Sequence, residues 1–153
     1  MKGKAGWITA ATCMVLILVS GCATVDYVAD AKTIVGATDW NNMKTVPVVL
    51  KEYSFTPSTL YFKANVPFKL QIQNEGTVKH YFTAEGFFKA IATRKVQSNA
   101  DGEIKAPYFS ALEVFPGRSL DMYFIPVTKG TYKLLCTNTG HEAQGMYGTI
   151  VIE

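Results

Sequence analysis

From Thr45 onward the sequence consists of short runs rich in Val, Ile, Phe, Tyr and Leu, separated by Pro, Gly and Asn. Runs of this kind predict β-strands bounded by turns. Phe68, Leu70 and Ile72 alternate with polar residues, as expected of a sheet with one solvated face. The series predicts an all-β fold, a Greek-key sandwich or barrel of about eight strands, at residues 45–53, 58–63, 67–74, 80–84, 106–115, 118–126, 130–136 and 146–153.

Residues 85–105 interrupt the regular spacing of these strands and form a predicted insertion. The segment contains four basic residues and a turn signal at 99–102. Periodicity does not distinguish an added hairpin from a flap with a short helix. We interpret the segment as a solvated insertion, because isolated basic residues are common on surface loops. The alternative is a docking surface for a protein partner.

The first 22 residues have the three parts of an export signal. Lys2 and Lys4 supply a basic start, residues 7–19 are mostly apolar, and small residues precede Cys22. The ending Val-Ser-Gly-Cys resembles the bacterial lipobox, which implies that residues 1–21 are a signal peptide and that Cys22 becomes acylated. An uncleaved anchor with a chance Gly-Cys pair is the alternative interpretation.

Acylation of Cys22 predicts a lipoprotein on the periplasmic side of a bacterial membrane. Two or three acyl chains give a stable attachment, whereas a single chain gives a marginal one. Ala23 follows the cysteine where Asp would signal retention at the inner membrane, so the outer membrane is favoured. We expect residues 22–44 to be the lipidated N-terminus and a tether, with a short helix around residues 25–34. We expect residues 45–153 to form one domain.

Removal of the leader leaves one free thiol and little net charge. The formal charge falls from +3 to +1, because the leader contains two lysines and no acid. This balance gives no indication of nucleic acid as a partner. Cys13 leaves with the leader and Cys22 carries lipid, so Cys136 has no partner for an internal disulfide. An unpaired thiol in an exported protein would be exposed to oxidation. We therefore expect Cys136 to be protected or bound to a metal.

Four side chains form a candidate metal site. His80 and His141 are the only histidines, and adjacent strands of a sandwich can bring their loops to one end. Cys136, His141 and Met146 are spaced five residues apart in "CTNTGHEAQGMYGTIVIE". Two imidazoles, a thiolate and a weak thioether favour copper, whereas structural zinc sites rarely use Met. Singly, each residue is more often core or surface than ligand; together they predict a site for one copper ion.

The same stretch resembles the C-terminal ligand loop of the cupredoxins, the small blue copper proteins. This family has Cys at the end of one strand, His in the loop, Met at its end, and then Gly and a last strand. The spacing Cys-x4-His-x4-Met looks most like auracyanin and rusticyanin, and "NEGTVKHYF" matches the upstream His. The resemblance covers about residues 45–153. It implies that His80, Cys136 and His141 are equatorial copper ligands and that Met146 is the axial one.

The chain departs from the family pattern directly after the first histidine. Most cupredoxins have Asn there, whose side chain ties the two ligand loops together and whose backbone amide bonds to the cysteine sulfur. Tyr81 occupies this position. We therefore expect the backbone amide to serve as in the family, and the side-chain tie to be absent.

The resemblance implies a carrier of single electrons and not an enzyme, because a closed four-ligand site has no open position for substrate. It also implies that the ring edge of His141 is the electron port, in an apolar patch with Ala143, Met146 and Tyr147 nearby. We expect a monomer that meets cytochromes or membrane oxidoreductases weakly and briefly. The alternatives are a copper-resistance or delivery protein using the same ligands, and a metal-free assembly or adhesion module.

Overall fold

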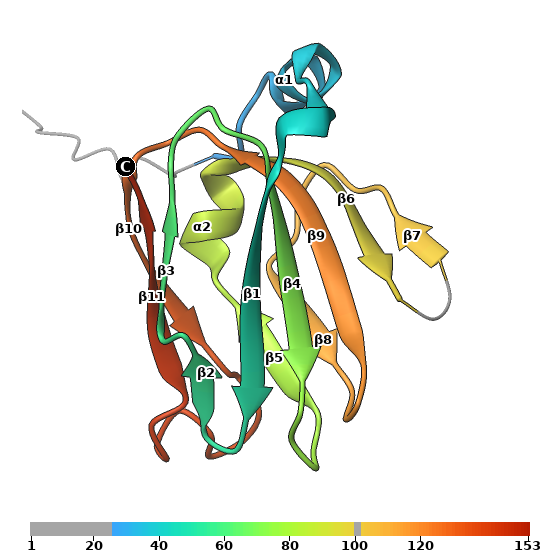
Figure 1. Cartoon of the computed structure of the whole chain (residues 1–153). Coiled ribbons are helices and arrows are strands. Elements are labelled where there is room, and N and C mark those ends of the chain that lie inside the picture. The colour runs from blue at the N-terminus through green and yellow to red at the C-terminus, as the bar shows by residue number, and fades with distance from the viewer. Residues whose placement is uncertain (1–25, 100–101) are drawn as a thin grey trace, which may run out of the picture.

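The computed structural model describes residues 26–99 and 102–153, which form two facing β-sheets (Figure 1). The six-stranded sheet has the order β2-β1-β4-β9-β6-β7, with β1 (Lys44–Lys51), β2 (Ser54–Thr56), β4 (Phe68–Asn74), β6 (Ile91–Ser98), β7 (Gly102–Ile104) and β9 (Ser119–Pro126). The five-stranded sheet has the order β3-β11-β10-β5-β8, with β3 (Thr59–Phe62), β5 (His80–Thr83), β8 (Ala111–Val114), β10 (Gly130–Leu135) and β11 (Tyr147–Ile152).

Successive strands often change sheet, so that β3, β4, β5 and β6 alternate between the two layers. Two neighbouring pairs are parallel, β1 with β4 and β11 with β3, and the other pairs are antiparallel. The prediction of an all-β Greek-key sandwich is confirmed, and every predicted run contains a strand. The predicted signal peptide and the acylated cysteine lie in residues 1–25, outside the described residues.

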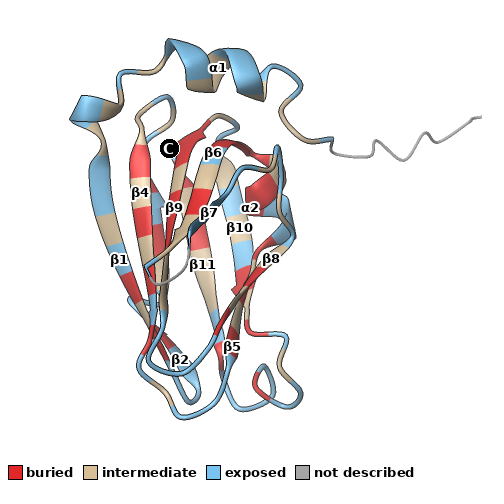
Figure 2. Ribbon diagram, turned by 90° about the vertical axis from the view of Figure 1, so that its right-hand side faces the viewer, coloured by how far each residue is buried: buried red, intermediate tan, exposed pale blue. Residues whose placement is uncertain are grey.

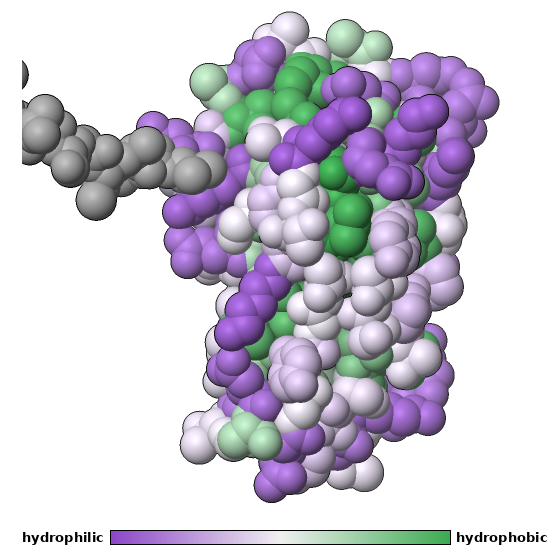
Figure 3. Space-filling view, turned by 90° about the vertical axis from the view of Figure 1, so that its left-hand side faces the viewer, coloured by the Kyte–Doolittle hydropathy of each residue, from purple (hydrophilic) through white to green (hydrophobic). Residues whose placement is uncertain are grey.

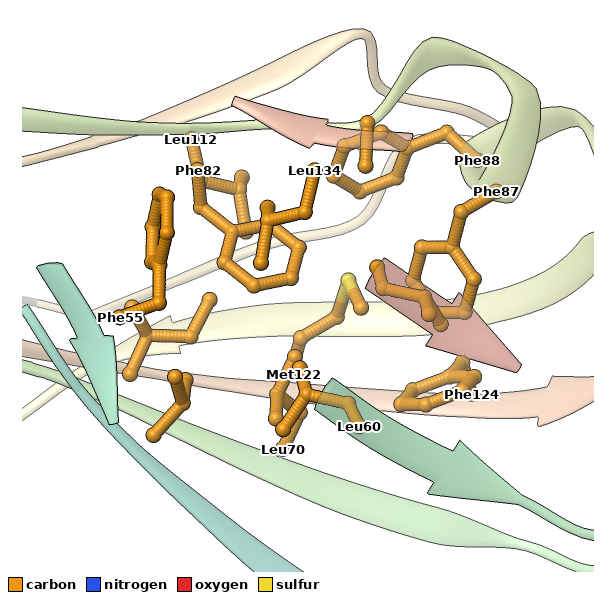
Figure 4. Packing of buried hydrophobic residues seen from close by; sticks show 14 of the residues in the cluster. Phe55, Leu60, Leu70, Phe82, Phe87, Phe88, Leu112, Met122, Phe124 and Leu134 are labelled. Carbon is orange, nitrogen blue, oxygen red and sulfur yellow. The ribbon is translucent and has the colours of Figure 1, made fainter. Parts of the chain in front are cut away.

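The inward faces of the two sheets meet in one core rich in phenylalanine (Figure 4). Phe62 packs edge-on against Phe68 and Phe124, with ring centroids 5.0 and 5.1 Å apart. The alternation predicted for β4 is present, because Phe68, Leu70 and Ile72 are all buried. Burial of each such side chain contributes roughly 1.5–3 kcal/mol, so these contacts hold the two layers together. Buried positions follow the strands, whereas α1 is exposed or half-buried (Figure 2).

Residues 87–93 of the predicted insertion belong to the core, so the prediction of a solvated insertion is wrong there, whereas the described residues 102–105 are exposed as expected. The segment forms the helix α2 (Glu85–Lys89), followed by β6 and β7. Phe87 and Phe88 of α2 are buried, and the Phe87 ring stacks on Phe62 with centroids 5.7 Å apart. Strand β6 pairs with both β9 and β7. The segment therefore joins the two sheets.

The strand β6 has no alternating pattern because both of its faces are covered. Ile91, Ala92 and Thr93 are buried in succession. The helix α1 packs against β6, and the core covers the other face. A shift of register between Thr93 and Lys95 disturbs the alternation further. Hydrophobic periodicity of two residues, which supported the prediction of β4, is absent for these physical reasons.

The predicted tether contains a helix that contacts the sandwich. The helix α1 (Ala31–Ala37) is followed by a 3-10 turn, η1 (Trp40–Asn42). The indole N–H of Trp40 donates to the carbonyl of Val35 at 3.2 Å, and the Arg94 guanidinium of β6 lies 4.7 Å from the Trp40 ring centre. These contacts hold α1 against β6. Among the residues that the structure describes, no helix has the length and apolar character needed to cross a membrane.

The outer face of the five-stranded sheet is open to solvent. Residues of intermediate and low hydropathy predominate there (Figure 3), and the side chains of Tyr61 and Tyr147 are exposed. At one end of the sandwich, opposite α1, the turn between β1 and β2, the loop between β4 and β5, and the loop between β10 and β11 come together (Figure 1). The candidate ligands lie at this end.

Replacement of Phe87 by alanine is expected to lower the free energy of unfolding by about 3–5 kcal/mol, because it leaves a cavity between α2 and the sheets. Lys89→Ala is the matched control in the same helix. Its side chain pairs with Glu85 at the surface and lies 6.0 Å from the Tyr27 ring centre, and neither contact is in the core, so the effect should stay within about 0.5 kcal/mol. Urea-induced unfolding measures both. Equal effects of the two substitutions would contradict a core role for the segment.

Candidate metal site

Strand pairing brings the two predicted ligand loops together. His80 is the first residue of β5, and Cys136 follows the last residue of β10. Strands β10 and β5 are neighbours, with Leu135 paired to Thr83. His141 lies in the loop that leads from β10 to β11. The sandwich therefore places residues from distant parts of the sequence at one end.

Three of the four predicted ligands converge in a buried cluster. The Sγ atom of Cys136 lies 3.8 Å from Nδ1 of His80 and 3.5 Å from Nδ1 of His141. The exposed fractions of the three residues are 0% for His80, 1% for Cys136 and 7% for His141. Their ligand atoms all lie within 4.8 Å of one another, which marks them as a group able to hold a metal ion.

The spacing of these atoms fits a single ion. With bonds of the length known for zinc, about 2.1 Å to nitrogen and about 2.3 Å to sulfur, two ligands of one ion lie at most about 4.4 Å apart. Both measured sulfur–nitrogen distances, 3.5 and 3.8 Å, are within this limit. A thiolate with two imidazoles is a donor set suited to copper. The residues present thus fit the metal that the sequence predicted.

Burial keeps the first histidine in its metal-binding form. The pKa of His80 is lowered, first because burial penalises the charged imidazolium and then because His141 is close; the nearby Glu52 carboxylate acts in the opposite direction. A lowered pKa means that the ring is neutral at neutral pH. Neutral imidazole is the form that binds a metal.

The backbone of Met146 is hydrogen-bonded to two of the other predicted ligands, His141 and Cys136. Its N–H donates to the carbonyl of His141 at 2.9 Å, and its carbonyl accepts from the N–H of Cys136 at 3.1 Å. The loop closes with Gly140 and Gly145 in the left-handed region, at φ of 81° and 99°, where glycine carries no steric penalty. The structure buries the Met146 side chain completely, and its role as axial ligand stays a prediction.

Tyr81 supplies the expected backbone contact. Its N–H donates to Sγ of Cys136 at 3.4 Å, as the family pattern predicted. The hydroxyl of Tyr81 points elsewhere and donates to Oε1 of Glu113 at 2.9 Å. The Tyr81 side chain therefore takes no part in tying the ligand loops together.

Other side chains tie the two loops, and sequence reasoning missed them. The Asn138 amide donates from Nδ2 to the carbonyl of Lys79 at 3.0 Å and lies 3.2 Å from Nε2 of His141. The hydroxyls of Thr83 and Thr137 are hydrogen-bonded at 2.9 Å. In this chain the side chain that links the two loops belongs to the C-terminal loop and donates to the loop that precedes His80. No sequence pattern pointed to Asn138, because the family places its Asn in the other loop.

The surroundings of the predicted electron port differ in part from expectation. The ring of Tyr53 packs edge-on against His141, with centroids 5.0 Å apart and planes at 87°. Tyr53 is 42% exposed, so it carries the aromatic surface outward from the nearly buried imidazole. Ala143 and Tyr147 are exposed, as expected of neighbours of a port. Met146 is fully buried, so of the three expected neighbours it adds no exposed surface to the port.

Glu52 is the second residue near the predicted ligands that sequence reasoning did not identify. Its Oε1 accepts from the N–H groups of Thr77 and Val78 at 2.6 and 3.0 Å. Its own backbone N–H and that of Thr77 are the main causes that lower the pKa of the Glu52 carboxyl to about 2. The carboxylate is therefore ionised, and its Oε1 lies 3.7 Å from Nε2 of His80.

Comparison with known proteins identifies the fold. A scan of known protein families finds no match, and no curated protein matches the sequence. Among solved structures, auracyanin B is 18% identical with a TM-score of 0.51, over 76% of this chain and 93% of auracyanin B. A multicopper oxidase from Campylobacter jejuni, a metallo-oxidase, is 15% identical with a TM-score of 0.58, over 76% of this chain and 31% of the oxidase.

A copper-containing nitrite reductase from Thermus scotoductus is also similar. It is 11% identical with a TM-score of 0.58, over 84% of this chain and 34% of the reductase. The chain thus spans about a third of the length of each enzyme, and nearly all of auracyanin B. The chain has the cupredoxin fold, and its His–Cys–His group lies where the sequence predicted a copper site.

Asn138→Ala is expected to lower the free energy of unfolding by about 1 kcal/mol, because the carbonyl of Lys79 loses its donor. Thr139→Ala in the same loop is the control, since Thr139 is exposed and the change should stay within about 0.5 kcal/mol. Urea-induced unfolding of the metal-free protein gives both values. If the Asn138 variant is as stable as the control, the loops are not held together by this side chain.

Proposed function

We propose that this chain holds one copper ion at His80, Cys136 and His141, with Met146 as fourth ligand, and carries single electrons between redox partners. The observation that supports the proposal most directly is the approach of two imidazole Nδ1 atoms to one buried sulfur, at 3.8 and 3.5 Å. The fold is shared with auracyanin B and with two enzymes that are described as copper proteins. When bound, copper supplies a one-electron couple between Cu(I) and Cu(II).

The chain's own residues contribute rigidity to such a site. The Tyr81 N–H is aimed at Sγ of Cys136, and Asn138 joins one ligand loop to the other. Ligands that are held before the metal arrives change little between two oxidation states, which favours rapid electron exchange. The burial of all three side chains also keeps water away from the metal.

The complete set of four proposed ligands supports an electron carrier over an enzyme. With two imidazoles, a thiolate and the proposed thioether around the ion, no ligand position remains for a substrate. The oxidase and the reductase that share the fold are about three times as long as the aligned region. Their activities therefore give no ground for an enzymatic role of this chain.

Partners would dock where His141 approaches the surface. Tyr53, Ala143 and Tyr147 offer an apolar and aromatic surface at this end of the sandwich. We infer brief contacts with cytochromes or membrane oxidoreductases, made by a monomer, because a small contact area suits redox encounters that must dissociate quickly. Nucleic acid is not an expected partner at a formal charge near zero.

We also propose that Cys22 carries lipid and holds the protein on the periplasmic side of a bacterial membrane, the outer membrane being favoured. The helix α1, which follows the leader in the chain, lies at the end of the sandwich opposite the ligand loops (Figure 1). An anchor ahead of α1 would leave the copper end accessible to partners. This geometry supports a tethered carrier.

Copper added to the purified soluble domain is expected to give the intense visible absorption of a Cu(II)–thiolate bond, at one copper per chain. Cys136→Ser should abolish the band, because the thiolate is its source. Met146→Leu should keep the band and shift the midpoint potential, whereas Met122→Leu, at another fully buried methionine, should change neither. Absence of the band together with absence of copper by elemental analysis would contradict the proposal.

A copper store with the same ligands is the competing function. The loaded protein separates the two when it is mixed with a reduced cytochrome and, separately, with a copper chelator. A carrier exchanges electrons rapidly and releases copper slowly. Slow exchange together with ready release would favour the store.

Fatty-acid labelling of cells that produce the full chain tests the anchor. We expect incorporation of label and recovery of the protein in the membrane fraction, and loss of both in Cys22→Ala. Ser20→Ala is the control, because a small residue is retained before the cleavage point. A soluble, unlabelled full chain would contradict the lipoprotein assignment.

A further inference from the structure

The turn between β1 and β2 places two consecutive residues against the two imidazoles. Oε1 of Glu52 lies 3.7 Å from Nε2 of His80, and the ring of Tyr53 packs edge-on against His141 at 5.0 Å. Neither residue belongs to the proposed ligand set. Glu52 brings a negative charge to the outer side of a ligand, and this contact can affect the metal through the imidazole.

His80 has one polar atom that the protein leaves without a hydrogen-bond partner. Its Nδ1 faces Sγ of Cys136 at 3.8 Å, and its Nε2 is buried with no hydrogen bond. When Nδ1 binds a metal, the neutral ring carries its proton on Nε2. That N–H must then find an acceptor, because a buried donor without one is destabilising. Ligating histidines nearly always donate this second N–H to a carboxylate, a carbonyl or water.

We propose that Glu52 is the positioning residue for His80: its carboxylate accepts the Nε2–H hydrogen bond when Nδ1 binds the metal, fixes the orientation of the ring, and lowers the midpoint potential of the site. This inference rests on the proposed copper function. At present the two atoms are 3.7 Å apart, so a movement of less than about 1 Å brings them to hydrogen-bond distance.

The carboxylate is held in place for this contact. Oε1 of Glu52 accepts from the N–H groups of Thr77 and Val78 at 2.6 and 3.0 Å, and from the Thr77 hydroxyl at 3.1 Å. The loop that carries these donors is fixed in turn by Asn74, whose Nδ2 donates to the carbonyl of Val78 at 2.8 Å. The anion therefore stays beside His80 even though 28% of its side chain is exposed.

Gly76 keeps the space between the carboxylate and the imidazole free. A Cβ atom at this position would lie 2.7 Å from Oε1 of Glu52 and 2.8 Å from Nε2 of His80. Both distances are shorter than any ordinary contact of a methyl group, so alanine at position 76 must push the two groups apart. Gly76 is thus the residue whose smallness permits direct contact between Glu52 and His80.

A negative charge beside a ligand favours the more positively charged state of the metal. Glu52 should therefore stabilise the oxidised site relative to the reduced one. Replacement by glutamine removes the charge and keeps a side-chain oxygen as acceptor. The expected result of Glu52→Gln is a fall of about tenfold in the ratio of oxidised to reduced protein at a fixed potential, which equals a rise of about 59 mV in the midpoint potential.

The experiment measures the midpoint potential of the copper-loaded protein from its visible band during a redox titration. Glu75→Gln is the matched control, because Glu75 is one residue from Gly76 and its carboxylate pairs with Lys51 at 3.0 Å. It removes the same charge and should change the ratio less than twofold. Gly76→Ala keeps the charge but displaces it, and should shift the potential in the same direction as Glu52→Gln.

An unchanged potential in both Glu52→Gln and Gly76→Ala would overturn the inference while leaving the copper function intact. Equal shifts in Glu52→Gln and Glu75→Gln would overturn it as well, because they would reflect net charge and not contact with His80. If Glu52→Gln fails to fold, the midpoint potential of Gly76→Ala alone decides the test. If the unaltered protein binds no copper, the proposed function and this inference both fail.

Discussion

The thiol of Cys136 is the point on which the rest of the site depends, because both imidazoles and a backbone amide are directed at its sulfur. Nδ1 of His80, Nδ1 of His141 and the N–H of Tyr81 lie 3.8, 3.5 and 3.4 Å from it. Polar groups buried this completely are stable only when they are paired. The cluster is a polar centre at the end of an otherwise apolar core, and a bound metal would satisfy it.

The sandwich explains why such a cluster can form. Neighbouring strands β5 and β10 carry His80 and Cys136 into the interior, and the loop that returns to β11 folds His141 and Met146 back over the thiol. The β1–β2 turn adds Glu52 on the far side of one imidazole and Tyr53 on the far side of the other. Three segments of chain thus surround the same three side chains. Hydrogen bonds join the β4–β5 loop to the other two segments, and the Tyr53 ring packs on His141.

The alternating strands and the ligand loop could be predicted from sequence, because period-two burial and the spacing from Cys136 to His141 to Met146 are local patterns. The strand β6 could not, since α1 covers its outer face and Ile91, Ala92 and Thr93 are all buried. Glu52 and Asn138 were also missed, because their roles depend on contacts with residues far away in the sequence. Family resemblance gave the ligands, but it placed the loop-tying side chain at position 81, where this chain has tyrosine.

The proposed function requires that the buried sulfur and the two imidazole nitrogens bind one copper ion together. X-ray absorption at the copper edge of the loaded protein tests it most directly, because it reports the atoms bonded to the metal and needs no partner protein. We expect two nitrogen neighbours and one sulfur neighbour at bonding distance from a single copper. A spectrum with oxygen and nitrogen neighbours only, and no sulfur at bonding distance, would contradict it.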